Sequence, residues 1–197
     1  MKTTEPIRNP KHVAKLINYY LHKNQMRNYL MISICVYTAL RISDVLAITS
    51  DQVYDFKKKR LRNLFTITEQ KTQKSKTIPI NDDLRKALTY CIPLLKPGKA
   101  LILNENTGNA ISRIQAYRLI RRAAEDCGIQ ENVSCHSLRK ILGYYSWKKG
   151  AHSSVIMEIY NHSSLAITQR YLGITQDEKN AVYFTLSFDS SSNDFNS

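Results

Sequence analysis

Apolar residues recur at helical spacing along most of the chain. The first such stretch opens at Pro10, a residue suited to the first turn of a helix, and its apolar positions lie three or four residues apart. Asn24 interrupts this pattern. The next stretch, residues 26–39, is apolar on most faces, which predicts a central, buried helix. A short third helix is predicted over residues 42–48.

Later helices are marked by residues that favour a helix start. Asn81 or Asp82 is predicted to open a helix that runs to about Leu95, and Ser112 opens one that ends at Gly128. Further helices are predicted to open at Ser134, at Ser153 or Ser154, and at Ser164, and a last helix is predicted over residues 177–188.

Between residues 53 and 80 the pattern changes to that of strands. Residues 61–68 alternate and are rich in β-forming side chains, and residues 77–80 resume the pattern after a polar segment. Residues 53–56 are predicted to form a short strand or turn. The predicted fold class is therefore mainly α with a small antiparallel β-sheet (α+β), and we detect no internal repeat.

The charge balance points to a class of partner. The chain has 29 Lys and Arg residues against 16 Asp and Glu residues, a formal net charge of +13. An excess this large is typical of proteins that bind polyanions, most often nucleic acid. Ribosomal proteins, RNA-modifying enzymes and basic secreted proteins share it, so charge alone leaves these classes open.

Cysteine spacing and hydropathy argue against a metal-binding protein, a secreted protein and a membrane protein. The four cysteines form no CxxC pair and have no zinc-like spacing, so we predict no metal site and no cofactor. The N-terminus has no apolar stretch typical of a signal peptide, and no run approaches the roughly 18 apolar residues of a membrane span. We expect a cytoplasmic protein, associated with the nucleoid and not with a membrane.

Four polar side chains stand out in the last third of the chain. His136 and Arg139 are three residues apart in a helical pattern, so they share one face. His162 ends a second apolar run, and Tyr171 ends a third. Histidine, arginine and tyrosine are the groups an enzyme needs to cleave a phosphodiester through a covalent tyrosyl intermediate. Taken one at a time, each also fits an ordinary structural role.

Earlier in the chain, cations are available to complete such a site. Arg41 lies between two apolar helical stretches, beside Asp44. It is either a surface arginine or an arginine held rigid and directed into a pocket, with Asp44 as an orienting partner. Three lysines on the predicted hairpin, Lys71, Lys74 and Lys76, fit a solvated strand edge, and one of them is also a candidate phosphate contact.

Four motifs occur in an order that resembles a known family. They are ALRISDVLAI (39–48), KTQKSKTIPI (71–80), HSLRK (136–140) and NHSSLAITQRYLG (161–173). Together they resemble the catalytic domain of tyrosine recombinases, the phage-integrase and Xer class. The resemblance covers residues 10–188, which we predict to be the catalytic domain, between a polar lead (1–9) and a disordered polar tail (189–197).

The resemblance implies a role for each matching residue. Arg41 and Arg139 match the two catalytic arginines, His136 and His162 the two histidines, and Tyr171 the nucleophile, while Lys71 matches the hairpin lysine. Two positions depart from the family pattern, because Asn161 and Gln73 stand where glycine is common. Asparagine is the next best residue after glycine for a left-handed helix end.

The resemblance also implies a mechanism. The arginines and His162 bind the non-bridging oxygens of the phosphate, and neighbouring cations lower the pKa of Tyr171. His136 accepts the proton of Tyr171, and Lys71 donates one to the leaving 5′-oxygen. Attack by Tyr171 leaves a 3′-phosphotyrosyl bond that keeps the energy of the broken linkage, so that rejoining needs neither ATP nor metal.

The sequence therefore predicts a site-specific DNA recombinase of the integrase or invertase type, encoded by a mobile element. Its expected partners are double-stranded DNA and further copies of itself, as a tetramer on DNA. The last predicted helix packs either on a neighbouring protomer, as is common in the family, or on its own domain. Only about ten residues precede the first catalytic helix, as in the short single-domain members that invert fimbrial promoters, or as in a fragment.

Four alternatives stay open. A DNA-binding regulator with the same fold, or a catalytic domain that depends on a partner to clamp DNA, shares the motifs. A type IB topoisomerase shares the chemistry, but its chains are longer. A basic RNA-binding module explains the charge but not the ordered motifs.

Overall fold

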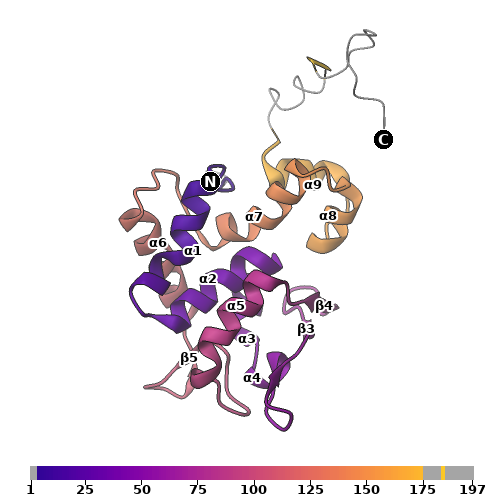
Figure 1. Cartoon of the computed structure of the whole chain (residues 1–197). Helices are drawn as coiled ribbons and strands as arrows, with labels where there is room; N and C mark the ends of the chain where they lie inside the picture. The colour runs from indigo at the N-terminus through magenta and orange to yellow at the C-terminus, as the bar shows by residue number, and fades with distance from the viewer. Residues whose placement is uncertain (1–3, 175–182, 185–197) are drawn as a thin grey trace, which may run out of the picture.

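The computed structural model describes residues 4–174 and 183–184, and its elements follow one another as helices interrupted by short hairpins (Figure 1). The helices are α1 (Pro10–His22), α2 (Met26–Thr38), α3 (Ile42–Ala47), α4 (Ser50–Val53), α5 (Asp82–Cys91), the 3₁₀ turn η1 (Ile92–Leu94), α6 (Arg113–Asp126), α7 (Cys135–Lys148), α8 (Ser153–Tyr160) and α9 (Leu165–Leu172). The strands are β1 (Tyr54–Asp55), β2 (Arg60–Leu61), β3 (Leu64–Thr68), β4 (Ser75–Pro79), β5 (Leu103–Asn104) and β6 (Asn109–Ala110).

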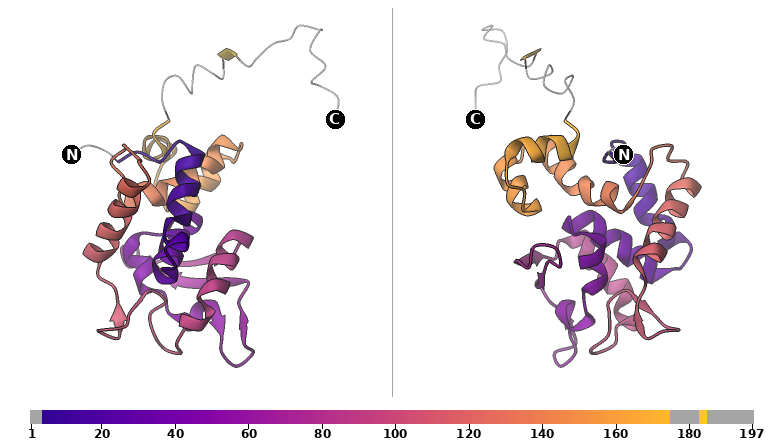
Figure 2. Two further views of the ribbon diagram at one scale, coloured as in Figure 1. Left: turned by 60° about the vertical axis from the view of Figure 1, so that its left-hand side comes forward. Right: turned by 180° about the vertical axis from the view of Figure 1, so that it is seen from behind.

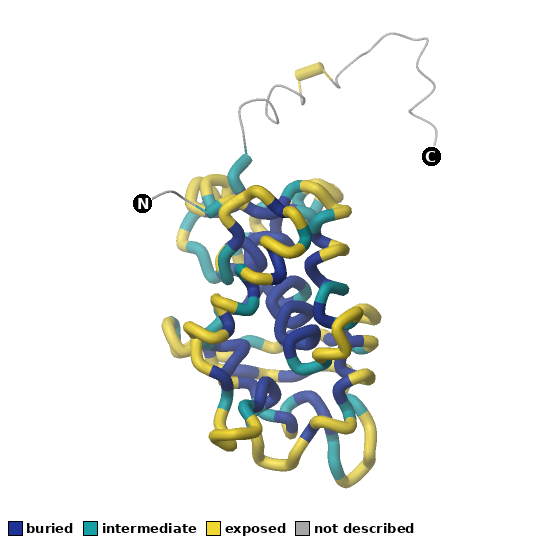
Figure 3. The backbone as a smooth tube through the Cα atoms, turned by 90° about the vertical axis from the view of Figure 1, so that its left-hand side faces the viewer, coloured by how far each residue is buried: buried dark blue, intermediate teal, exposed yellow. Residues whose placement is uncertain are grey.

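Helix α2 is the centre of the fold, as its apolar pattern predicts. It packs against α1, α5 and α7, and most of its residues are buried. In Figure 3 the buried backbone runs through the middle of the molecule, with exposed segments on the outside. A helix that is apolar on most faces is stable only where other elements cover every side of it, which is the arrangement seen here.

Most predicted helix starts are confirmed. The side chains of Asn81, Ser112, Ser134 and Ser164 each accept a hydrogen bond from a backbone amide in the first turn that follows. These bonds satisfy amide groups that have no partner inside the helix. Helix α8 differs from the prediction, because it begins at Ser153 and its capping residue is His152, with no side-chain hydrogen bond to the backbone.

Two predicted element boundaries were wrong, each for a physical reason. The predicted strand 61–68 is two strands, because Leu61 pairs back to Tyr54 whereas Leu64 pairs forward to Pro79. The result is a set of separate two-stranded antiparallel sheets within the described residues. Helix α5 stops at Cys91 rather than near residue 95, because Pro93 has no amide hydrogen and favours a short 3₁₀ turn.

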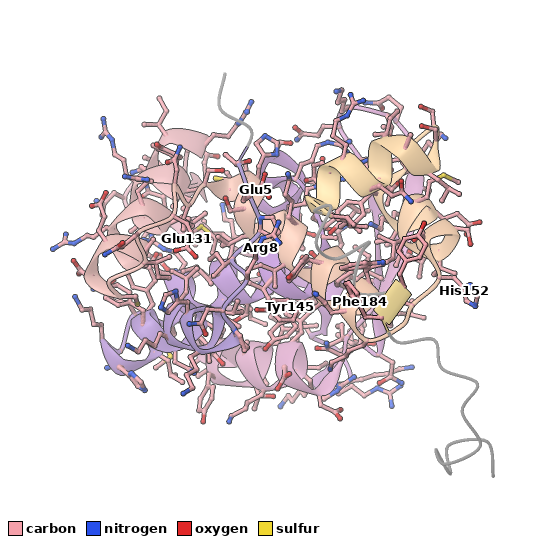
Figure 4. All side chains as sticks on the ribbon, turned by 90° about the horizontal axis from the view of Figure 1, so that it is seen from above. Glu5, Arg8, Glu131, Tyr145, His152 and Phe184 are labelled. Atoms are coloured by element: carbon pink, nitrogen blue, oxygen red, sulfur yellow. The ribbon has the colours of Figure 1, made fainter. Side chains whose placement is uncertain are left out.

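Helices α8 and α9 form a small unit at one end of the molecule, reached through α7 (Figures 1 and 2). Its buried apolar residues Ile156, Tyr160 and Leu172 form, with Ala39 at the end of α2, a cluster separate from the main core. The N-terminal segment binds this unit to the rest, because Arg8 Nη2 donates to the carbonyl oxygen of Gly173 at 2.6 Å and Tyr145 donates to the Arg8 carbonyl at 2.9 Å. Figure 4 shows Glu5, Arg8 and Tyr145 in succession across this side of the molecule.

The predicted last helix (177–188) and polar tail (189–197) lie outside the described residues, except for Tyr183 and Phe184. Across residues 4–174 and 183–184, none of the helices combines the length and apolar character needed to span a membrane.

The central position of α2 generates a test of the core. Ile34 is 1% exposed on α2, and Ile34→Ala should lower the free energy of unfolding by about 2–5 kcal/mol, because it leaves a cavity in a packed core. Ile114 on α6 is 63% exposed, and Ile114→Ala should change stability by no more than about 0.5 kcal/mol. Urea unfolding of both variants checks this, and equal losses would contradict the placement of α2.

Candidate active site

Four segments far apart in the sequence supply the side chains of the candidate site. They are the α2–α3 junction, the hairpin β3–β4, the first half of α7, and the helix pair α8–α9. The hairpin is joined to α8 by two direct contacts, from Lys76 Nζ to the carbonyl oxygen of Ile159 at 2.7 Å and from Asn161 Nδ2 to Glu69 Oε2 at 2.9 Å. The site therefore forms where the hairpin meets the end of α8.

Arg41 is held between α2 and α3. Ala39 ends α2 in the left-handed conformation (φ 54°), and Arg41 is the capping residue of α3. Its side chain is 22% exposed and forms an ion pair with Glu69 at 3.4 Å. This geometry supports the directed-arginine interpretation over the surface one. Asp44 is not the observed ion-pair partner of Arg41, because its Oδ1 accepts the amide of Gln70 at 2.9 Å.

Glu69 is a central residue of the site that the sequence analysis missed. It is fully buried, and its Oε2 accepts hydrogen bonds from Thr72 Oγ1 and Asn161 Nδ2. Burial raises the pKa of Glu69, but these two bonds and the charge of Arg41 outweigh it, so the net pKa is lowered and the carboxyl group stays ionised. Strand alternation carries the signal, because Phe65, Ile67 and Glu69 all face inward.

The inward and outward alternation of side chains along the hairpin places a different lysine in the site from the one expected. Lys71 is exposed at the turn of the hairpin, and Lys74 is exposed as well. Lys76 pairs across the hairpin with Ile67 and faces inward. Its burial, with Arg139 and Arg41 nearby, lowers its pKa to about 8, although the charge of Glu69 opposes the shift. In the structure Lys76, not Lys71, lies among the other charged groups.

Both positions where glycine was expected have a left-handed backbone. Asn161 ends α8 with φ 54°, and Gln73 has φ 56° in the hairpin turn. The chain therefore keeps the backbone conformation there and accepts the strain of a side chain. At Asn161 the side chain also makes the hydrogen bond to Glu69, which glycine cannot make.

His162 and Tyr171 face each other across the turn between α8 and α9. Their rings meet edge to face with centroids 5.0 Å apart, and His162 Nδ1 lies 3.1 Å from Thr168 Oγ1. Thr168 is fully buried and bonded to the carbonyl oxygen of Ser164, so it fixes the orientation of the imidazole. The sequence analysis did not identify Thr168, which lies within the last motif.

Neighbouring cations lower the pKa of Tyr171 as expected, but in the free protein burial has the larger effect and the net pKa is raised. Burial raises this pKa, and the opposing charges of Arg139 and Arg41 do not fully compensate. The Tyr171 hydroxyl is buried, and Arg139 acts on it by charge and as a side-chain hydrogen-bond donor, although no bond of ordinary geometry forms within the described residues. The phenol of Tyr171 is therefore protonated at neutral pH.

Arg139 and His136 lie on α7, as their spacing predicts. Arg139 is buried, and its Nη1 is without a hydrogen-bond partner in the described part of the chain. His136 lies in the first turn of α7 and is exposed at the edge of a groove that Ile42 and Arg113 also line. Desolvation and nearby cations, first Arg139, lower the pKa of His136, and desolvation with Arg139 and Arg41 does the same for His162. Both imidazoles are therefore neutral near pH 7.

The arrangement suits an anion bound beside a tyrosine. Arg139 and Arg41 supply positive charge to the hydroxyl of Tyr171, and the His162 ring packs against the Tyr171 ring. Lys76 and His136 lie near the same two arginines. Among the described residues, no three His, Cys, Asp or Glu side chains come together as a metal site.

Comparison with known proteins identifies the family. Residues 9–178 match the model of the phage integrase family. The chain belongs to the phage integrase family. Members of this tyrosine recombinase family are DNA strand-transfer enzymes.

Relatives differ in how much of their length the chain covers. It is 36% identical to the probable integrase/recombinase YoeC of Bacillus subtilis over 183 residues, which cover 93% of this chain and 97% of YoeC. It is 28% identical to tyrosine recombinase XerD of Corynebacterium glutamicum, covering 87% of this chain but 58% of XerD. The chain thus spans under two thirds of this longer member of the phage integrase family.

Solved structures support the fold. XerA recombinase superposes with a TM-score of 0.74 at 20% identity, over 92% of this chain and 65% of XerA. XerH site-specific recombinase, bound to the palindromic difH substrate in a post-cleavage complex, gives 0.69 at 20% identity, over 94% of this chain and 54% of XerH. The mainly helical fold with small antiparallel sheets is therefore that of phage integrase family catalytic domains.

The contact between Glu69 and the cations generates a prediction. Glu69→Gln removes the negative charge that holds up the pKa of Lys76, so the pKa should fall below about 8. NMR titration of ¹³Cε-labelled lysines measures it, with Lys76→Met identifying the signal. Glu105 is exposed and pairs with Lys96, so Glu105→Gln should leave the titration unchanged. An unchanged titration in Glu69→Gln would contradict the coupling.

Proposed function

We propose that this chain is a site-specific DNA recombinase that cleaves and rejoins duplex DNA through a 3′-phosphotyrosyl bond at Tyr171. The observation that carries the proposal is a pair of buried groups, the Tyr171 hydroxyl and Arg139 Nη1: Arg139 lies close enough to lower the pKa of the tyrosine, yet neither atom makes a hydrogen bond of ordinary geometry within the described residues. A buried polar atom with no hydrogen bond costs about 1–3 kcal/mol, and such atoms persist where a ligand completes them. A phosphate completes both, since it accepts from the guanidinium and receives the attacking oxygen.

The arginines and Lys76 act on the phosphate. Attack builds negative charge on the non-bridging oxygens, and Arg41 and Arg139 meet that charge with forked donors. Preorganised donors of this kind commonly contribute about 2.7–4 kcal/mol each to the transition state. Lys76 adds a cation held in place by its bond to the Ile159 carbonyl.

Tyr171 has to lose its proton as it attacks. Its raised pKa keeps it protonated in the free protein, and the lowered pKa of His136 keeps that imidazole neutral and able to accept a proton. His162 is held by Thr168 and the ring of Tyr171; a bound phosphate favours its protonated form, which donates a further hydrogen bond to the phosphate from Nε2.

The two hairpin lysines have different tasks. A cation that stabilises charge has to be held in place, which fits the inward side chain of Lys76. A proton donor to the leaving 5′-oxygen has to reach an atom of the DNA, which lies outside the protein. We assign that role to Lys71, which is exposed at the turn of the same hairpin.

Rejoining follows when a 5′-hydroxyl attacks the phosphotyrosine, with the bond energy conserved. Similar proteins support DNA as the substrate, since XerH is solved with its palindromic difH substrate in a post-cleavage complex. Recombination joins two duplexes, so several copies of this chain, four in our proposal, act together on DNA.

The covalent step provides the decisive experiment. Duplexes nicked near candidate sites, made from the DNA that flanks its gene, should trap a protein–DNA adduct on a denaturing gel. Tyr171→Phe should abolish the adduct, because the attacking oxygen is gone. Tyr90→Phe, at an exposed position on α5, is the matched control and should leave the adduct unchanged.

An adduct that persists in Tyr171→Phe would refute the assignment of the nucleophile. DNA binding without any adduct would instead favour a regulator, or a catalytic domain that needs a partner to clamp DNA.

A modified leaving group separates the two lysines. In a substrate with sulfur at the 5′-bridging position, the leaving thiolate needs no proton, so the cleavage defect of Lys71→Ala should largely disappear. Lys76→Ala should stay slow on the same substrate, because the charge it supplies to the phosphate is still missing. Single-turnover cleavage rates on the oxygen and sulfur substrates make the comparison, and rescue of Lys76→Ala alone would reverse the two roles.

A further inference from the structure

Tyr160, the last residue of α8, contacts three of the residues assigned above. Its side chain is fully buried, and its ring stacks on His162 with centroids 5.3 Å apart and an interplanar angle of 19°. The Tyr171 ring lies 5.1 Å away on a tilted plane. The guanidinium carbon of Arg139 lies 5.2 Å from the ring centroid, close enough for a cation–π contact.

The hydroxyl group of Tyr160 is inserted into α7. It donates to the carbonyl oxygen of Arg139 at 2.6 Å and accepts from the amide of Gly143 at 3.0 Å. These are the two backbone groups that an uninterrupted α-helix joins directly, four residues apart. A side chain inserted into this ladder alters the local course of the helix. Here the contact is made at the residue that carries the guanidinium group.

Gly143 provides the space for this contact. A Cβ atom at position 143 would lie 2.5 Å from Cε2 and 2.8 Å from the hydroxyl oxygen of Tyr160, and 2.8 Å from Leu172 Cδ2. These distances are shorter than packed atoms tolerate. The glycine therefore serves the close approach of α8 to α7, since its φ is not in the left-handed region.

Packing alone does not explain the hydroxyl group. The cluster around Tyr160 is small and apolar, formed with Ala39, Ile156 and Leu172. Phenylalanine would fill the same volume and would leave Arg139 and Gly143 free to make the ordinary helical bond. What the hydroxyl adds is a fixed position for the start of the Arg139 side chain relative to His162 and Tyr171.

We propose that Tyr160 is a positioning residue for DNA cleavage, which sets the direction of Arg139 through α7 and aligns His162 and Tyr171 on its ring. This rests on the proposed strand-transfer function. Loss of the hydroxyl should slow the chemical step and leave DNA binding intact, because displacements of about 1 Å in a catalytic group can cost roughly 100-fold in rate.

Tyr160→Phe tests the proposal, with Tyr20→Phe as a matched control. Tyr20 is also buried, and its hydroxyl donates to the Leu119 carbonyl at 3.0 Å, far from the site in the packing of α1 on α6. On the nicked duplex that gives the wild-type adduct, the single-turnover rate of Tyr160→Phe at saturating DNA should fall about 10- to 100-fold. The half-saturating DNA concentration should stay within about 3-fold of wild type, and Tyr20→Phe should match wild type in both.

A second readout needs no DNA. Arg139 contributes to the lowered pKa of His162, so a displaced guanidinium shifts the His162 titration. We expect the NMR titration of the His162 ring proton to shift in Tyr160→Phe and to coincide with wild type in Tyr20→Phe. Coincident curves for all three proteins, or equal rate losses in both variants, would overturn the proposal.

The outcomes separate this inference from the proposed function. A wild-type adduct with an unimpaired, folded Tyr160→Phe overturns only the positioning role. Absence of a wild-type adduct is a failure of the proposed function, and the titration still decides whether Tyr160 sets Arg139. If Tyr160→Phe does not fold, Gly143→Ala, which pushes the ring from the other side, replaces it, and a wild-type rate in that variant overturns the proposal.

Discussion

The ion pair between Arg41 and Glu69 is the constraint on which the rest of the site depends. Arg41, Arg139 and Lys76 place positive charge close together in a partly buried region, which is costly without a counter-charge. Glu69 provides it, and through Asn161 it also fixes the end of α8. One carboxylate therefore joins the hairpin, the α2–α3 junction and the turn that carries His162.

One part of the fold provides most of the apolar core, and another part holds the side chains of the candidate site. The main core around α2 is large and continuous, whereas α8 and α9 rest on a small cluster of their own. Polar contacts attach this small unit to the rest: Lys76 to the Ile159 carbonyl, Glu69 to Asn161, and Arg8 to the Gly173 carbonyl. Because such bonds are directional, they define the placement of His162 and Tyr171 more narrowly than apolar packing does. The buried hydroxyl of Tyr160 belongs to the same set.

Sequence patterns predicted the features that depend on residues close together in the chain. Capping side chains marked the starts of α5, α6, α7 and α9, and helical spacing placed His136 and Arg139 on one face. Glu69 was missed because the first hairpin strand was predicted to end at Thr68. Glu69 is the next residue, and its side chain faces inward. Lys76 was named only as one of three hairpin lysines, because the second hairpin strand was predicted to begin at residue 77, whereas it begins at Ser75. The contacts of Tyr160 with Gly143 and Arg139 join residues 17 and 21 positions apart on different helices, and no periodicity within one segment reports them.

Burial and nearby positive charge act in opposite directions on the pKa of Tyr171 in the free protein. Burial keeps the phenol protonated, and the two arginines counter that effect only in part. Arg41 meanwhile is engaged by Glu69, so part of the cationic charge is already balanced by a carboxylate. Under the proposed function, a phosphate entering the site competes with Glu69 for Arg41 and gives Arg139 Nη1 a partner. Binding of the substrate and assembly of the reactive arrangement are then one event, since the same anion satisfies the donors and lies in the path of the attacking oxygen.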